Sequence, residues 1–399
     1  MHYKTIILAL IVSNSAIASE LSLNEYLNQV KERSLGLKQE EAKFNSVEST
    51  ASLGIRLPPP NLGFTQQNED HGVISNGFEI SQEIPFPTKL TSDYSARKYE
   101  ALAQKEMLHS SYNEILSKAK LAYIDLWVAQ EQLGLLNEKT NILEQHLRLS
   151  RSAVRSDSFL SVHLLKAESD RDFLENEVIG AQQKIREKQI VLAEIINEDI
   201  NSFKPIVAEP ELSRIPEKFN LDETPHLGIY RYMLESFKER ETTAKSAWLP
   251  DFSLKYKEMG ANTTTNRYNE IMLGVTLPFL YFWEPNSEVK KAKSESLQAE
   301  LSLSREKKNL EAKIISLYVK AESLLKQIEN LKNKLIPRAE KRMRLVHNLA
   351  PRDMETITDH RETMEAFPNL KMNELDLRLQ YEEVVSELEK HISKGLYHE

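Results

Sequence analysis

The chain has 399 residues, a formal net charge of −8 and no cysteine. The negative charge argues against a nucleic-acid partner, and the missing cysteines exclude disulfides and an N-terminal lipid anchor. Only 11 glycines accompany 28% charged residues, a composition typical of long helices with hydrated outer faces.

Residues 1–18 have the features of a secretory signal peptide. A positive start at Lys4 is followed by a short apolar core and by a small-x-small cleavage site that ends at Ala18. We therefore expect cleavage near Ala18 and export of the mature chain; an uncleaved anchor is the alternative, but the apolar core is short for a bilayer. No later run reaches the roughly 18 apolar residues of a transmembrane helix, so membrane insertion must use strands.

The first structural repeat is expected over 19–197, and it opens with a helix. Ser22 and Glu25 have the spacing of a capping box, which predicts that the helix begins there. The helix should run to about Ile55, with a break near Gly36. A proline run then stops it.

A β-hairpin, a long helix and a return helix complete this first repeat. Alternation of apolar and polar residues predicts the hairpin over about 60–86. The long helix should run from about 88 to 153, with Thr88 as a candidate cap. The chain then turns into a return helix over about 161–197.

An irregular equatorial connector is expected over 198–224, where three prolines occur without helical periodicity. Thr224 followed by Pro225 resembles a helix cap with a first-turn proline. The second repeat, 225–399, should therefore begin there with a helix. It continues with a hairpin over about 251–280, a long helix over about 287–349 and a return helix to about 393.

The duplication is strongest in the long helices, where small or apolar residues recur at alternating steps of four and three. Such a stripe indicates a helix packed along its length in a coiled coil, and its recurrence indicates internal symmetry. The return helices repeat at an offset of 196, so that Leu174 matches Leu370 and Leu192 matches Leu388. The seam of the first long helix is Ile115, Ala119, Ala122, Leu126, Ala129, Leu133, Leu136, Thr140, Leu143 and Leu147, and an offset of 195 carries its first eight members to Leu310, Ile314, Leu317, Ala321, Leu324, Ile328, Leu331 and Leu335.

Both hairpins have one apolar and one polar face. A half-buried sheet on a soluble core is the usual meaning of this pattern, but the helices offer no obvious apolar patch to cover it. The signal peptide and the alternation together favour a lipid-facing sheet in an outer membrane. The lipid-facing candidates are Phe64, Phe78, Ile80, Ile84, Phe252, Leu254, Ile271, Leu273 and Val275.

Aromatic residues gather where strands give way to helices. Rings at the ends of an apolar band mark the membrane interface of barrels, although any single ring could simply cap a domain junction. The candidates are Phe86, Trp248, Phe279, Tyr281, Phe282 and Trp283.

Four strands cannot close a barrel, and lipid tolerates no open sheet edge, so several chains must contribute. The sequence therefore predicts an α+β membrane protein. Its duplicated units of two strands, a long helix and a return helix would form a trimeric, 12-stranded outer-membrane β-barrel, with four strands from each chain. This barrel would continue into a periplasmic α-helical coiled-coil barrel.

Several segments resemble the TolC-type outer-membrane efflux proteins, and especially the outer-membrane components of heavy-metal cation efflux systems of the RND type. The segments GFEISQEIPFPTKL from Gly77 and LGVTLPFLYFW from Leu273 resemble the strand-to-helix junctions of that family. AWLPDFSLKY from Ala247 and LRLQYEEVVSELE from Leu377 resemble its helix-to-strand junction and final helix. The resemblance covers essentially the mature chain. It implies a homotrimer that contacts outer-membrane lipid, a periplasmic membrane-fusion adaptor and an RND-type inner-membrane pump.

The periplasmic tips depart from the family, which often has a glycine and then a serine before each return helix. The first tip reads RSDSFL from Arg155, and the second reads PRDMET from Pro351. Pro368 also falls where the return helix should be continuous. Three copies of each tip carboxylate can form rings that favour cations and control opening, and arginines can lock them in salt bridges; ordinary surface charge is the alternative for each residue. The gate candidates are Asp157, Asp353, Asp359, Arg155 and Arg352.

We find no catalytic constellation, phosphate loop or nucleophile motif in the sequence, so we expect no enzyme activity and no cofactor. Glu69, Asp70 and His71 could hold a cation weakly, but they fit better as solvated loop residues. The sequence predicts a passive outer-membrane exit duct of a tripartite efflux system, with cations as the first cargo from resemblance only. Drugs or an exported polypeptide remain alternatives, and a soluble periplasmic coiled-coil adaptor or spacer is the rival class.

Overall fold

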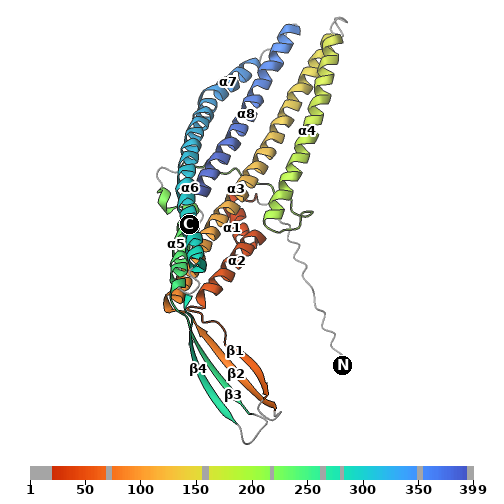
Figure 1. Ribbon diagram of the computed structural model, residues 1–399. Coiled ribbons are helices and arrows are strands. Elements are labelled where there is room, and N and C mark those ends of the chain that lie inside the picture. Colours follow the sequence, from red (N-terminus) through yellow and green to blue (C-terminus); the bar gives the residue numbers. More distant parts are fainter. Residues whose placement is uncertain are drawn as a thin grey trace, which may run out of the picture. The chain divides into compact units, whose positions relative to one another are not determined.

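The computed structural model describes residues 20–68, 74–154, 161–215, 220–260, 267–278, 283–347 and 354–392. They form long helices that lead into and out of one four-stranded antiparallel sheet (Figure 1). The elements are α1 (Leu23–Arg33), α2 (Leu35–Ser52), β1 (Asn61–Asn68), β2 (Ile74–Ile84), α3 (Pro87–Val154), α4 (Ser161–Ile195), η2 (Leu221–Glu223), α5 (Pro225–Lys245), η3 (Ser246–Trp248), β3 (Phe252–Met259), β4 (Tyr268–Val275), α6 (Trp283–Asn330), η5 (Leu331–Leu335), α7 (Ile336–His347) and α8 (Met354–Ile392).

The chain divides into two compact units, each built from three separate stretches. One unit comprises the residues up to Leu35, 116–215 and 317–387, and it holds the central and distal parts of the long helices. The other comprises 36–115, 216–316 and the residues from Leu388 onward, and it holds the sheet with the helix segments that lead to it. Both α3 and the second long helix therefore contribute to both units.

The first helical segment starts as predicted, and its break comes slightly earlier. The Ser22 side chain accepts a hydrogen bond from the Glu25 backbone and the Glu25 carboxylate accepts one from the Ser22 backbone, so the capping box is confirmed. The break lies at Ser34, whose ψ of 121° is extended, rather than at Gly36. The expected helix therefore becomes α1 and α2.

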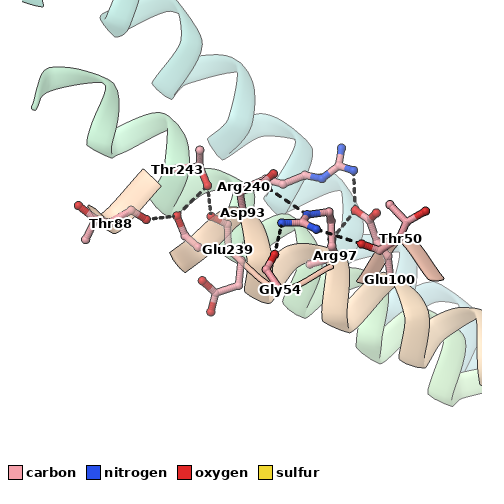
Figure 2. A network of polar contacts seen from close by, with 11 residues as sticks. Thr50, Gly54, Thr88, Asp93, Arg97, Glu100, Glu239, Arg240 and Thr243 are labelled. Carbon is pink, nitrogen blue, oxygen red and sulfur yellow. Dashed lines mark hydrogen bonds and ion pairs between the residues drawn. The ribbon is translucent and has the colours of Figure 1, made fainter. Parts of the chain in front are cut away.

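Helix α2 ends at Ser52, three residues before the predicted end, because Gly54 adopts a left-handed conformation with φ of 66°. The Arg97 guanidinium on α3 donates hydrogen bonds of 3.0 Å to the carbonyls of Thr50 and Gly54 (Figure 2). Asp93, one turn earlier on α3, holds the same guanidinium at 3.0 Å. A cation at a helix C-terminus is favourable because it meets unsatisfied carbonyls there.

Helix α3 runs without interruption for 68 residues, which corresponds to about 102 Å at 1.5 Å per residue. It begins at Pro87, so Thr88 lies inside the first turn and does not cap the helix as predicted. The seam is buried in its central and distal parts, where Ala119, Leu126 and Leu147 are fully buried. Leu136 and Leu143 of α3 form a core cluster with Leu174 of α4, against which partly buried residues of α4 and α8 pack.

The connector between the repeats is tied to the N-terminal segment by a backbone bridge and to α3 by the Tyr123 side chain. Val207 forms a parallel bridge with Leu21, and the Tyr123 hydroxyl donates to the carbonyls of Leu21 at 2.6 Å and Ala208 at 2.9 Å. The Thr224 cap with proline at the first position of α5 is confirmed, since the Thr224 side chain accepts a hydrogen bond from the Leu227 backbone.

The second long helix contains a π-helical turn, η5, that the heptad pattern does not reveal by itself. A π-turn adds one residue to a helix. Equivalent seam residues of the two repeats are therefore 195 positions apart before η5 and 196 positions apart after it. Leu331 remains 4% exposed, but Leu335 is 39% exposed, and Ile336 takes the seam position at 6%. The prediction of Leu335 as a seam residue is therefore wrong.

The return helices of the two repeats are α4 and α8. The structure places α4 at Ser161–Ile195 and α8 at Met354–Ile392. Helix α8 continues through Pro368, so the proline that departs from the expected pattern does not divide the helix. The element order α2, β1, β2, α3, α4 thus has its counterpart in α5, β3, β4, α6 with α7, and α8.

Candidate functional site

The strand register places all the lipid-facing candidates on one face of the sheet. Directly opposed residues of neighbouring strands share a face, and Leu62, Ile80, Tyr256 and Ile271 form one such row across all four strands. A second row joins Gln82, Leu254 and Leu273. The two hairpins, which lie far apart in the sequence, therefore build a single apolar surface.

This apolar face is open to its surroundings in the single chain. Phe64 is 89% exposed, Leu273 82% and Ile271 71%, which is unusual for large apolar side chains in an aqueous protein. Ile80, Ile84, Phe252, Leu254 and Val275 are also exposed, and Phe78 is half-buried with its ring centroid 6.1 Å from that of Tyr256.

The opposite face is polar and carries charges of both signs. The Lys255 ammonium lies 3.0 Å from the Glu79 carboxylate, and Lys257 is directly opposed to Glu79 on one side and to Glu270 on the other. A sheet with one apolar exposed face and one charged face suits a wall between lipid and water.

The sheet has two open edges. Its order is β1-β2-β3-β4, so within the described part of the chain β1 pairs only with β2 and β4 only with β3.

Gly77 is required where β2 approaches β3, because an added Cβ would lie 2.1 Å from the Glu258 carbonyl oxygen.

Asp251 fastens the sheet to the helices, a role that the sequence pattern did not indicate. Its carboxylate accepts hydrogen bonds of 2.8 Å from the Phe86 backbone and from the Lys89 ammonium at the start of α3. The Asp251 backbone N–H donates a hydrogen bond to the Thr276 hydroxyl, beyond the end of β4. The Asp251 carbonyl accepts one from the Thr276 backbone N–H. The available signal was an acidic residue between a Leu-Pro helix stop and a strand.

Two aromatic candidates lie beside this junction. Phe86 is half-buried immediately before α3, and Trp248 is 40% exposed at the end of η3. Trp283 begins α6. Phe279, Tyr281 and Phe282 lie outside the described residues, as do the loop residues Glu69, Asp70 and His71.

Among the gate candidates only Asp359 lies within the described residues, on an exposed position of α8. Asp157, Asp353, Arg155 and Arg352 lie outside them. The structure therefore leaves the proposed carboxylate rings as a prediction.

A half-buried ion pair beside a buried histidine, on α3, α4 and α8, was also missing from the sequence-based expectations. The Arg361 guanidinium on α8 lies 2.7 Å from Asp170 on α4, and the His146 side chain on α3 is only 8% exposed nearby. Burial lowers the pKa of His146 to about 4, with a further lowering by the Arg361 charge. Nothing in the local pattern of α3 singles out His146, because only the packing of three helices creates its environment.

The described segments lack two features that would have suggested other sites. No group of three or more His, Asp or Glu side chains there could hold a metal ion. No helix within those segments combines the length and the apolar character that crossing a membrane requires.

Solved structures share this architecture despite low sequence identity. A membrane protein from Pseudomonas aeruginosa matches over 93% of both chains with 12% identity and a TM-score of 0.80. CusC, described as forming a transmembrane channel, matches over 94% of this chain and 92% of its own with 13% identity and a TM-score of 0.79. The MtrE outer membrane channel of Neisseria gonorrhoeae, in its open state, matches over 92% and 88% with 15% identity and a TM-score of 0.76.

No protein-family model and no curated protein sequence matches the chain. The structural neighbours include outer-membrane channels of the TolC family, so the predicted fold class of four strands and long helices is confirmed. The heavy-metal branch of that family is not singled out by these neighbours.

Proposed function

We propose that this chain is the subunit of a trimeric outer-membrane exit duct in a tripartite efflux system. The observation that carries the proposal is the four-stranded sheet, which exposes a band of apolar residues on one face and whose two edges are unpaired within the described residues. A lipid-facing sheet cannot keep open edges, since the unpaired backbone groups find no water in the bilayer. Three copies close the sheet when β4 of one copy pairs with β1 of the next, in an antiparallel sense.

The helical parts of three copies extend this barrel into a periplasmic tube. The signal peptide directs export and is cleaved near Ala18. The repeats over 19–197 and 225–399 then supply equivalent parts of the wall around the connector 198–224. A periplasmic adaptor docks on the helical tips and an RND-type inner-membrane pump supplies energy. The duct itself is passive and catalyses no reaction.

Cations are the first cargo to test, because the sequence resembles cation-efflux components. Carboxylate rings formed by Asp157, Asp353 and Asp359, locked by Arg155 and Arg352, would favour cations and control the opening of the tip. Asp353→Ala should then change cation preference or gating in planar bilayers. Unchanged conductance properties would remove Asp353 from the gate.

Two neighbouring residues of β4 on opposite faces provide the test of the barrel. Leu273→Arg places a charge on the lipid-facing surface and should reduce membrane insertion, with a cost of about 2–4 kcal/mol near the bilayer centre. Met272→Arg places the same charge on the polar face and should insert normally while changing the conductance. Fractionation and gels of unheated and heated detergent extracts measure both results.

The rival is a soluble periplasmic coiled-coil adaptor or spacer. It predicts recovery of the wild-type chain without detergent and no heat-sensitive trimer on gels. It also predicts that Leu273→Arg and Met272→Arg are distributed equally between the soluble and membrane fractions, because neither face of the sheet would meet lipid. Either result would overturn the proposed duct.

A further inference from the structure

A hollow of about 740 Å³ lies between α2, α3, α5 and α6, within the unit that contains the sheet. Its walls are mainly apolar and include Met107 of α3 and Met233, Tyr230 and Phe237 of α5. Small-molecule sites in proteins commonly have volumes of about 300–1,000 Å³ and mostly apolar walls with a few polar groups.

The polar part of the wall centres on Glu100 of α3, which Figure 2 shows beside Arg240 of α5. Glu100 Oε1 accepts hydrogen bonds from both the Ser236 hydroxyl, at 2.9 Å, and the Arg240 guanidinium. Its second oxygen, Oε2, has no hydrogen-bond partner within the described part of the chain. The carboxylate can therefore accept one more donor from a molecule in the hollow.

The hollow carries more negative than positive charge. Glu295 of α6 is a second carboxylate in the wall, and its contact with the exposed Lys291 is a long one of 3.9 Å. Arg240 is the cation among the lining residues, and it is already engaged by Glu100 and by the Phe237 ring, whose centroid lies 5.8 Å from the guanidinium carbon. A ligand with a positive group is thus favoured over an anion.

We propose that this hollow binds amphipathic organic cations, a proposal that rests on the duct function above and names a class of cargo for it. The apolar body of such a molecule would lie against Met107, Met233 and Phe237, since flexible thioethers adapt to varied apolar shapes and aromatic rings attract cations. Its basic group would donate to Glu100 Oε2. A small metal ion fits less well because it needs several ligand atoms, and the hollow is mainly apolar.

The test measures binding of rhodamine 6G, a fluorescent organic cation, to the full-length trimer in lipid nanodiscs by fluorescence anisotropy. Glu100→Gln keeps the shape of the side chain and should weaken binding about tenfold, because a charged hydrogen bond becomes a neutral one. Arg240→Gln removes the competing cation and should leave binding unchanged or tighter. A structural role of the Glu100–Arg240 pair would weaken binding in both variants.

Three controls sharpen the result. Glu239→Gln removes a carboxylate beside Arg240 that does not line the hollow, and it should bind as wild type. Fluorescein, an anion, should not bind. Ala299→Trp fills the hollow from α6 and should abolish dye binding while the trimer still forms and conducts.

Three outcomes would overturn the proposal: no binding of the dye by the wild-type trimer, equal affinity of wild type and Glu100→Gln, or loss of the trimer in Ala299→Trp. The last would mean that a second copy of the chain fills the hollow. A wild-type trimer that conducts normally but does not bind the dye would contradict this inference alone. A wild-type chain that forms no trimer would contradict the proposed duct.

Discussion

The two long helices share one seam but differ in what surrounds it. Tyr123 of α3 is fully buried and hydrogen-bonded to the connector, whereas its counterpart Tyr318, 195 residues later, is only partly buried. Lys120 of α3 is 7% exposed, 3.9 Å from the fully buried Glu382, while its counterpart Ile315 is 58% exposed. The usual placement of charged and apolar residues is thus inverted between the repeats.

This inversion shows that duplicated helices can acquire different roles within one chain. The central part of α3 is enclosed by other elements of the same protomer, and it uses polar groups to anchor them. Helix α6 keeps one buried seam and exposes Leu297, Leu301, Ile315 and Val319. Exposed apolar residues of this kind fit a surface that other copies cover in the proposed trimer.

The largest effect is expected from deleting one residue of α3, which runs as a regular helix with no π-turn to absorb the change. Deletion of the exposed Asn137 should rotate the buried Leu143 and Leu147 by about 100° away from the seam. Loss of these buried contacts should lower the free energy of unfolding by about 3 kcal/mol or more. Chemical denaturation of the detergent-solubilised protein measures this.

The matched change in the second long helix is deletion of the exposed Asn333, which should convert the π-turn to regular α-helix, keep Ile336 on the seam and have the smaller effect. An Asn137 deletion that is no more destabilising than the Asn333 deletion would mean that the π-turn does not absorb an extra residue.

Exchanging the character of Lys120 and Ile315 tests the inversion directly. Lys120→Met removes the cation that lies near the buried Glu382 carboxylate, while the hydrogen bonds from Ser213 to this carboxylate remain. Because a buried charge then lacks its counter-ion, the substitution should cost about 3 kcal/mol of folding free energy. Lys118→Met, at an exposed position of the same helix, is the matched control. Denaturant midpoints compare the two.

In the second repeat, Ile315→Lys should leave the fold of the protomer intact and reduce the trimer fraction on unheated gels. A stable trimer in this variant, or a Lys120→Met protein as stable as its control, would contradict the comparison.

The hairpins offer a smaller contrast between the repeats. Gly77→Ala should cost about 2 kcal/mol, because the new Cβ would meet the Glu258 backbone, which cannot move without disturbing the pairing of β2 and β3. Gly274→Ala would meet the Ser253 hydroxyl at 2.3 Å, which can rotate away, so its cost should stay below about 1 kcal/mol. Heating series on gels should show the trimer of the first variant dissociating at the lower temperature; the reverse order would argue against the β2–β3 register.

The smallest expected effect is a pH dependence in the first repeat. His146 faces Arg361, Asp170 and His360, and its counterpart at an offset of 196 is the exposed Arg342. Because the pKa of His146 is about 4 in the folded protein and 6.5 for an ordinary histidine, its neutral form stabilises the fold above pH 6.5, and this stability is lost as the pH falls from 6.5 through 4. Between pH 7 and pH 5 the loss should amount to about 2 kcal/mol or less.

Melting temperatures at pH 7 and pH 5 measure this dependence. His146→Gln should flatten it, while His163→Gln, at an exposed position of α4, should keep it. An equal slope in wild type and His146→Gln would assign the pH dependence to other groups.

Much of the fold follows from local patterns. The Ser22 capping box, the Thr224 cap, the alternation in both hairpins and the heptad seam are all encoded by near neighbours in the sequence, and each has its counterpart in the structure. The first helix breaks at Ser34, two residues before the predicted position, and α3 starts at Pro87, one residue before its predicted start. Helix ends depend on backbone contacts that the periodicity does not contain.

The candidate site was predictable only in part. The alternation selected the apolar strand residues correctly as members of one face, since side chains of a strand point to alternate sides. It could not reveal that β2 pairs with β3, nor that Asp251, Glu100 and Glu382 meet partners far away in the chain.

The sequence by itself determined the duplication, the helix and strand periods and the two-faced character of the sheet, because these depend on spacing along the chain. Only the tertiary structure decided that Lys120 is buried while Ile315 is exposed, that a π-turn shifts the second seam, and that a hollow forms beside Glu100. The physical reason is that burial and electrostatic environment depend on which distant elements pack together, and two copies of one pattern can pack against different neighbours.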